Sequence, residues 1–222
     1  MTKNTKATLT VVLVSLAALA VALIAFRPGS PAPAPAAAQG SPPVAPELLV
    51  REDSHRLSSA PDGKVTLVEF LDFECEACRA AFPVVEGLRA EYGNRITVVA
   101  RYFPIPSHAN AENAAIAVEA AAGQGRFEDM YRKMYETQAT WGERRESKAI
   151  LFRVFAAELG LDLGAYDRAV ADPATRERIM RDRADGTAAG VQGTPTFFLN
   201  GARVQPRSAD ELRTLIDAAL AR

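Results

Sequence analysis

The sequence is short of the residues on which several protein classes depend. Two cysteines among 222 residues are too few for a disulfide framework. The two histidines, His55 and His108, do not have zinc-finger spacing, so a zinc site would lack ligands. A net charge of −1 gives no basic field to attract nucleic acid, and no segment is repeated. The composition, 48% hydrophobic and 24% charged, is that of a globular protein with one sizeable core or two small ones.

One long uncharged stretch lies near the beginning of the sequence. Between Lys6 and Arg27, 20 residues carry no charge. As a helix rising about 1.5 Å per residue, this stretch spans the roughly 30 Å core of a bilayer. It is also longer than the apolar part of a secretory signal, about 7 to 15 residues. We therefore expect residues 1–27 to be an uncleaved signal anchor, with a signal peptide cut near residues 36–38 as the alternative. Either one places the remaining chain outside the cytoplasm, where disulfides persist. The uncleaved anchor would hold it at the cell membrane as a single-pass protein.

A proline-rich stretch follows the uncharged segment. Residues 28–46 hold seven of the 14 prolines, interleaved with alanine, glycine and serine. Such a composition cannot build a core and favours extended polyproline II. We expect residues 28–47 to be a stiff linker and residues 48–222 to be the folded domain.

The folded part alternates between strand and helix patterns. Strands are expected at residues 48–57, 64–71, 95–103, 196–200 and 202–205, and helices at 77–92 and 208–221. The long stretch at about 104–190 has helical periodicity throughout. The order strand, helix, strand, helical insert, hairpin and helix predicts an α/β fold, with a mixed sheet flanked by helices and a helical subdomain inserted at its middle.

The two cysteines lie three residues apart in Phe-Glu-Cys-Glu-Ala-Cys-Arg, where a strand ends and a helix begins. The positive end of a helix lowers the pKa of a thiol, which favours Cys75 as a nucleophile. Cys78 lies one turn later and can form a disulfide with Cys75 that opens and closes through a mixed disulfide. The pattern therefore predicts a catalytic dithiol. A static disulfide closing so short a loop would stabilise little.

An acid interrupts the apolar strand before the cysteines. Glu69 lies six residues before Cys75, an even spacing that puts both on the same side of a regular strand. Burial would raise the pKa of Glu69 and suit it to pass a proton to or from Cys78. The alternative is an exposed glutamate on an edge strand.

Several segments together resemble one known family. The stretches LDFECEACR, GQGRFEDMYRKMYE and GVQGTPTFFLNG, with His108, are similar to the DsbA-like thiol:disulfide oxidoreductases of the thioredoxin fold, in a membrane-anchored bacterial form. The similarity covers about residues 62–221. It implies a thioredoxin fold with an inserted helical subdomain, and an acid beneath the active site at Glu69.

The resemblance also assigns a role to the loop at Thr194 and Pro195. It implies a cis peptide bond between them, although most X-Pro bonds are trans. The loop would face the cysteines and bind an extended substrate through its backbone, with the Thr194 hydroxyl near the nucleophilic sulfur. His108 is expected to cap or brace the first helix of the insert. The aromatic residues Phe103, Trp141, Phe197 and Phe198 are expected in the core.

The implied activity is a disulfide-forming oxidase for exported proteins. A membrane partner of the DsbB or vitamin K epoxide reductase type would recycle it, and we expect no cofactor. A disulfide reductase or isomerase at the same place is one alternative. A copper- or metal-binding module, holding copper(I) through Cys75 and Cys78, is another, although no methionine or histidine cluster lies near the pair.

The residues between the cysteines bear on the redox potential. Strongly oxidising relatives usually carry Pro-His there, whereas this chain has Glu76-Ala77, with Glu74 on the other side of Cys75. A negative charge beside Cys75 opposes its thiolate, although salt screens an exposed charge. The sequence therefore predicts a milder potential than that of a strong oxidase.

Overall fold

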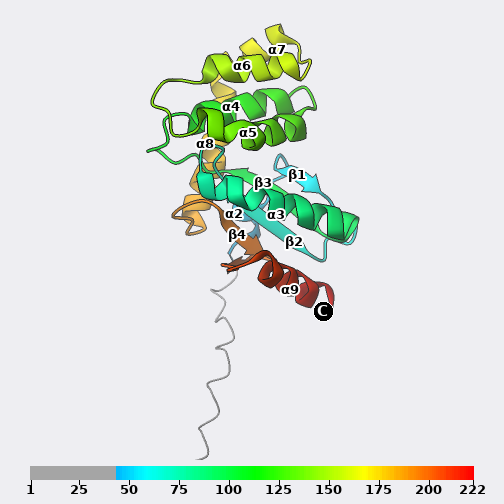
Figure 1. Cartoon of the computed structure of the whole chain (residues 1–222). Coiled ribbons are helices and arrows are strands. Elements are labelled where there is room, and N and C mark those ends of the chain that lie inside the picture. The colour runs from blue at the N-terminus through cyan, green and yellow to red at the C-terminus, as the bar shows by residue number, and fades with distance from the viewer. Residues whose placement is uncertain (1–43) are drawn as a thin grey trace, which may run out of the picture. The chain divides into compact units, whose positions relative to one another are not determined.

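The computed structural model describes residues 44–222 (Figure 1). The expected anchor at residues 1–27 and most of the expected linker at 28–47 lie outside the described residues. None of the helices within residues 44–222 combines the length and apolar character needed to cross a membrane.

The described residues form one mixed sheet of five strands, in the order β1-β3-β2-β4-β5. The strands are β1 (His55–Ser58), β2 (Thr66–Leu71), β3 (Thr97–Tyr102), β4 (Thr196–Leu199) and β5 (Ala202–Val204). The central strands β2 and β3 are parallel, and helix α3 (Glu76–Tyr92) connects them, while the other neighbours pair antiparallel. Both faces of the two central strands are covered, which explains their nearly continuous apolar sequences. The expected fold class is confirmed.

Side chains alternate between two cores on opposite faces of the sheet. Leu67 and Leu71 of β2 belong to the larger core, together with Cys78 and residues of α3 and the insert. Val68 and Phe70 belong to the smaller core, which also contains Leu49 and Val191 on the other face. This alternation decides the environment of Glu69, which lies between Val68 and Phe70 in the sequence.

Five helices lie between β3 and β4 and form the insert. They are α4 (Ala111–Ala122), α5 (Phe127–Trp141), α6 (Ala149–Glu158), α7 (Leu163–Ala171) and α8 (Pro173–Ala188), and α9 (Ala209–Leu220) follows the last strand. Helices α6 and α7 pack against α4, away from the sheet (Figure 1). The expected core aromatics Phe103, Trp141, Phe197 and Phe198 are all buried.

The expected strand at residues 48–57 is wrong over most of its length. A short helix, α2 (Pro46–Leu49), occupies the beginning, and β1 starts only at His55. Proline is favoured in the first turn of a helix, and Glu47 adds a favourable negative charge there. Leu49 is buried in the smaller core, so packing outweighs the strand propensity of this segment.

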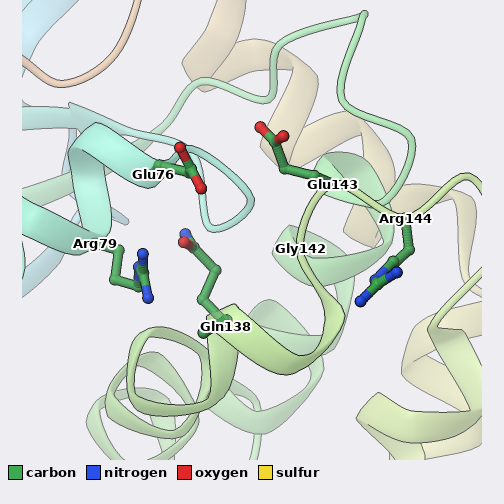
Figure 2. A pocket seen from close by; sticks show the side chains of 7 residues that line it. Glu76, Arg79, Gln138, Gly142, Glu143 and Arg144 are labelled. Atoms are coloured by element: carbon green, nitrogen blue, oxygen red, sulfur yellow. The ribbon is translucent and has the colours of Figure 1, made fainter.

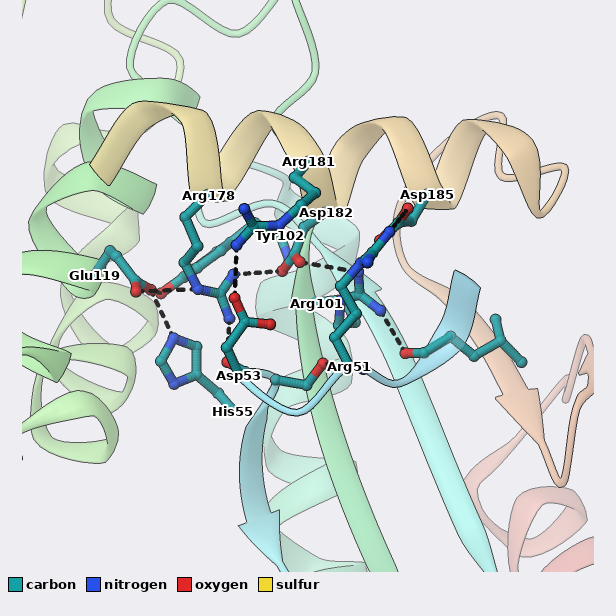
Figure 3. Close-up of polar contacts among 12 residues, drawn as sticks. Arg51, Asp53, His55, Arg101, Tyr102, Glu119, Arg178, Arg181, Asp182 and Asp185 are labelled. Carbon is teal, nitrogen blue, oxygen red and sulfur yellow. Dashed lines mark hydrogen bonds and ion pairs between the residues drawn. The ribbon is translucent and has the colours of Figure 1, made fainter. Parts of the chain in front are cut away.

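A network of charged residues joins α8 to the face of the sheet that carries the smaller core (Figure 3). Arg101 of β3 is fully buried, and its guanidinium lies 2.9 Å from a carboxylate oxygen of Asp182 and 2.7 Å from one of Asp185. Arg101 also donates a hydrogen bond of 2.6 Å to the carbonyl of Leu49. A buried arginine therefore holds α8, α2 and the sheet together.

Candidate active site

The two cysteines occupy the beginning of α3. Cys75 is the N-cap residue of the helix and is half-buried, whereas Cys78 is buried, and both are free thiols in this structure. A hydrogen bond from the Cys78 thiol lowers the pKa of Cys75 to about 5, with further lowering by the Thr194 side chain and the backbone N–H groups of Cys78 and Ala77. Burial opposes this shift. The helix N-terminus thus acts as the sequence predicts, but the partner thiol has the larger influence.

The second thiol has the opposite properties. Burial raises the pKa of Cys78 well above its ordinary value, and the neighbouring Cys75 and Glu69 raise it further. The pair therefore consists of one thiolate and one protonated thiol at neutral pH. Such an asymmetric pair can attack through Cys75 and hold Cys78 in reserve.

Glu69 lies in the middle of β2, between Ala100 of β3 and Phe197 of β4. It is only 2% exposed, and burial raises its pKa to about 8, with added repulsion from Cys75 and Glu86. The alternative of an exposed glutamate on an edge strand is wrong.

The spacing argument that linked Glu69 to Cys75 needs correction. Strand β2 ends at Leu71 and Cys75 already caps α3, so strand alternation does not extend from one residue to the other. The carboxyl instead belongs to the sheet face covered by the larger core, which contains Cys78. The Glu69 carboxylate raises the pKa of the Cys78 thiol.

The loop before β4 closes the site on the other side. The Thr194–Pro195 peptide bond is cis, as the resemblance implies. The Cys75 thiol donates a hydrogen bond of 3.3 Å to the Thr194 carbonyl. The Thr194 hydroxyl is buried without a hydrogen-bond partner among the described residues, although this side chain lowers the pKa of Cys75. Backbone and side chain of Thr194 thus both face the nucleophile.

The two acids beside Cys75 have different environments. Glu74 is buried, and its carboxylate accepts hydrogen bonds from the backbone N–H of Asn110 at 2.6 Å and of Glu143 at 3.0 Å. It therefore faces the insert, whereas Glu76 is exposed. Neither acid is among the main influences on the pKa of Cys75. Glu74 therefore gives no reason to expect a milder redox potential.

His108 braces the loop before the cysteines. Its Nδ1 atom lies 2.8 Å from the Asp72 carboxylate, which also accepts hydrogen bonds from the backbone N–H groups of Glu74 and Ile105. Burial raises the pKa of Asp72 despite these bonds. The histidine therefore ties the insert to the end of β2, rather than capping the first insert helix.

Gln138 of α5 is a site residue that the sequence did not reveal. Its side chain is 2% exposed, and its Nε2 atom donates hydrogen bonds of 2.7 Å to the Phe73 carbonyl and 2.9 Å to the Cys75 carbonyl. Gln138 lies 63 residues from Cys75 in the sequence, so only the packing of α5 brings them together. The amide holds the backbone of the nucleophile from the insert side.

Replacing Gln138 by leucine should lower the free energy of unfolding by about 1–3 kcal/mol, because two carbonyl groups lose their buried donor. Urea unfolding measures this loss. Gln124→Leu is a matched control, since Gln124 also makes two hydrogen bonds, but near the surface, and should cost less. Gln138→Glu should be more stable at pH 5 than at pH 7, because only a protonated carboxyl can donate a hydrogen bond to these carbonyls. Equal stability at the two pH values would contradict this account.

A hollow of about 240 Å³ opens beside the cysteines, between the start of α3 and the end of α5. Figure 2 shows Glu76 and Arg79 of α3 facing Gln138, with Glu143 and Arg144 beyond Gly142. A second hollow, of about 280 Å³, is lined by Pro195, Phe197 and residues 203–206. Two separate surfaces therefore flank Cys75 and can contact a bound molecule.

Residues 44–222 contain no group of three or more histidine, cysteine, aspartate or glutamate side chains arranged to hold a metal ion. Cys75 and Cys78 are therefore without further ligands of these types in the part of the chain that the structure describes.

Comparison with known sequences connects the chain to a large family. The family model described as thioredoxin matches residues 54–218. The Na(+)/H(+) antiporter NhaA of Herminiimonas arsenicoxydans is 36% identical over 174 residues, which are 78% of this chain and 25% of the antiporter. NhaA 1 of Mycolicibacterium gilvum is 34% identical, over 72% of this chain and 26% of that protein. The chain spans about a quarter of the length of these curated relatives, and their names describe the longer proteins.

Several solved structures match the described fold over nearly their whole length. A thioredoxin-like oxidoreductase from Silicibacter pomeroyi has a TM-score of 0.67 at 26% identity, covering 81% of this chain and 99% of that one. Wolbachia pipientis alpha-DsbA1 has a TM-score of 0.67 at 18% identity, over 78% and 94% of the two chains. BdbD from Bacillus subtilis has a TM-score of 0.63 at 18% identity, over 74% and 91%. The fold is thus that of DsbA-like thiol:disulfide oxidoreductases.

Proposed function

The chain belongs to the thioredoxin family, and from this premise we propose that it is an extracytoplasmic thiol:disulfide oxidoreductase that forms disulfide bonds in exported proteins. The observation that carries the proposal is the asymmetry of the two thiols, with the pKa of Cys75 near 5 and that of Cys78 far above its ordinary value. The uncharged stretch between Lys6 and Arg27 supports the location.

The oxidised pair would act in two exchange steps. A substrate thiolate attacks Cys75 Sγ, the Cys75–Cys78 bond breaks, and Cys78 leaves with the electron pair and takes a proton from Glu69. A second substrate thiolate then attacks the substrate sulfur of the mixed disulfide, and Cys75 leaves as a thiolate. The substrate gains a disulfide and the protein becomes a dithiol. A membrane partner of the DsbB or vitamin K epoxide reductase type would remove the two electrons.

The low pKa of Cys75 favours this direction over the reverse. A stabilised thiolate favours the reduced protein and leaves the mixed disulfide readily, so the disulfide form is a better oxidant. The exposed Glu76 acts in the opposite sense, but salt screens it. In place of the milder potential expected from the sequence, we therefore expect a redox titration against glutathione to place the pair toward the oxidising end. A potential typical of a thioredoxin would favour the reductase instead.

The proposal is tested by trapping substrates in cells with Cys78→Ser. Cys75 can still attack a substrate, but the mixed disulfide cannot be resolved by Cys78. Exported cysteine-containing proteins are expected as disulfide-linked adducts that reductant releases, and the Cys75→Ser/Cys78→Ser chain is the control. Adducts with cytoplasmic proteins alone, or none at all, would contradict the proposed function.

The alkylation rate of Cys75 in the reduced protein should rise with pH and reach half its maximum near pH 5. Below that pH the thiol is protonated and unreactive, because its pKa lies near 5. Cys78→Ala removes the strongest lowering influence, so the midpoint should move to higher pH. Iodoacetamide labelling followed by mass spectrometry gives both curves. A midpoint near pH 8.5 in the unmodified protein would show an ordinary thiol.

Replacing Glu69 by leucine should stabilise the protein and slow thiol–disulfide exchange. Burial raises the pKa of Glu69 from its ordinary 4.5 to about 8 in the folded state. The folded protein therefore keeps the Glu69 proton while the unfolded chain loses it, and the free energy of unfolding falls as the pH rises from 4.5 to 8. The gain in the free energy of unfolding should be about 3 kcal/mol larger at pH 7 than at pH 4. Exchange should slow by about 100-fold as Cys78 loses its proton donor. An equal gain at both pH values would show that Glu69 is not protonated on folding.

A further inference from the structure

The hollow between α3 and α5 contains an unused hydrogen-bond acceptor. The Nε2 atom of Gln138 faces two carbonyl oxygens, which can only accept, so the orientation of the amide is fixed by chemistry. Its Oε1 atom therefore points away from Phe73 and Cys75, and both side-chain hydrogen bonds of Gln138 within residues 44–222 are made by Nε2. Gln138 lines the hollow, as Figure 2 shows, so this buried side chain offers an acceptor to a bound molecule.

Charges of both signs line the same hollow without neutralising one another. Glu76, Arg79, Glu143 and Arg144 take part in no ion pair within the described residues, although Arg89 on the same helix α3 pairs with Glu86 and Glu128. In Figure 2 the Glu76 carboxylate and the Arg79 guanidinium both extend toward Gln138. The hollow thus provides acceptors for a cation and donors for an anion within about 240 Å³.

This combination fits a group that carries an ammonium and a carboxylate together. A cysteine within a polypeptide brings no such group, because its amino and carboxyl groups are peptide bonds. A free α-amino-acid end carries both charges on one carbon atom, and a volume of 240 Å³ holds it with part of a short peptide. Glu76, which lines the hollow, follows Cys75 directly, and Gln138 donates a hydrogen bond to the Cys75 carbonyl, so the hollow borders the backbone of the nucleophile.

We propose that this hollow binds the α-amino-acid end of a small thiol or its disulfide, of the glutathione class. The ammonium would bind Gln138 Oε1 and the carboxylates of Glu76 and Glu143, and the carboxylate would bind Arg79. The bound thiolate attacks Cys75 Sγ of the oxidised pair, Cys78 leaves as thiolate and is protonated, and a second small thiol releases the small disulfide and the Cys75 thiolate. This inference rests on the proposed function and adds a small-molecule substrate to it.

Three thiols that differ only far from the sulfur test the recognition. Glutathione carries both charged groups, glutaryl-cysteinyl-glycine lacks only the ammonium, and 4-aminobutyryl-cysteinyl-glycine lacks only the neighbouring carboxylate. We expect the rate constant for reduction of the oxidised full chain to fall about tenfold or more for each analogue, the loss of a hydrogen bond to a charged group. Equal rate constants for all three thiols would overturn the inference.

Variants of the hollow give a second test, in which the sign of the effect is informative. Glutathione has a net negative charge, so removing an acid should speed its approach if only the general field matters. If the ammonium is bound specifically, Glu143→Gln should lower the rate constant for reduction by glutathione about tenfold. The variant should then react equally fast with glutathione and with the glutaryl analogue. Glu136→Gln, an exposed acid of α5 outside the hollow, is the matched control and should change neither rate. A faster reaction of Glu143→Gln with glutathione would contradict the inference.

An uncharged thiol separates this inference from the proposed function. 2-Mercaptoethanol should reduce the unmodified chain and Glu136→Gln at rates within about twofold of one another. For Glu143→Gln, the rate constant with glutathione divided by that with 2-mercaptoethanol should fall about tenfold. If 2-mercaptoethanol reacts but the three peptide thiols are not distinguished, the hollow has no such role and the exchange chemistry stands. If no thiol reduces the Cys75–Cys78 disulfide, the proposed function itself fails.

Discussion

Replacing Cys75 by serine is expected to abolish thiol–disulfide exchange, with a loss in kcat/KM of at least about 1000-fold, as removal of a nucleophile causes. Serine is not ionised at neutral pH and cannot form a disulfide. The fold should survive, because a serine hydroxyl can donate to the Thr194 carbonyl as the thiol does. Oxidation of a reduced two-cysteine peptide, followed by alkylation and mass spectrometry, measures the effect.

The companion variant separates the roles of the two thiols. Cys78→Ser should still react once with a peptide disulfide, because Cys75 attacks, and should then stop at the mixed disulfide. Cys75→Ser should form no adduct, since the pKa of Cys78 is raised and the thiol is buried. Adducts through Cys78 in Cys75→Ser would reverse the assignment of nucleophile and resolving cysteine.

Replacing Arg101 by methionine is expected to lower the free energy of unfolding by about 3–5 kcal/mol, the largest stability effect that we predict. Arg101 is fully buried, and its loss leaves the carboxylates of Asp182 and Asp185 facing each other on α8 without their shared cation (Figure 3). Arg51 also pairs with Asp185 but is partly exposed, so Arg51→Met should cost much less. Urea unfolding of the reduced protein compares the two.

A triple variant tests whether unpaired charge is the cause. Arg101→Met combined with Asp182→Asn and Asp185→Asn removes Arg101 together with both of its carboxylates and should recover part of the lost stability, with Arg178 still paired to Glu119 and only Arg51 losing its single partner. If the triple variant is less stable than Arg101→Met, the packing of the arginine side chain, and not its charge, is what matters. Exchange by the folded fraction should be unchanged, because Arg101 lies on the sheet face opposite Glu69.

The sequence predicted the parts of the site that depend on local pattern. Cys75 at the start of a helix and Glu69 in an apolar strand follow from the residues immediately around them. The prediction that an acid beside Cys75 in the sequence also lies beside its sulfur failed for Glu74. Glu74 precedes Cys75 but points to Asn110 and Glu143 in the insert, because the chain changes from strand to helix at this point.

The contacts that could not be predicted join distant parts of the chain. Asp72 receives His108 from 36 residues away, and Gln138 reaches Phe73 across 65 residues. Nothing in the sequence around Gln138 or His108 distinguishes a buried side chain that hydrogen-bonds the active-site loop from an exposed one. Their roles depend on how the helices of the insert pack against the end of β2, which periodicity alone does not specify.

The hydrogen bond from Cys75 to Thr194 joins residues 119 positions apart. Contacts of such long range cannot form before most of the chain has been synthesised and has collapsed. A chain in which α3 has not yet formed carries two ordinary thiols, with pKa values near 8.5 and little thiolate at pH 7. The contribution of Thr194 to the lowered pKa of Cys75 is added only when β4 takes its place beside β2. Folding thus activates Cys75 in steps and limits premature coupling of a newly made chain to other proteins.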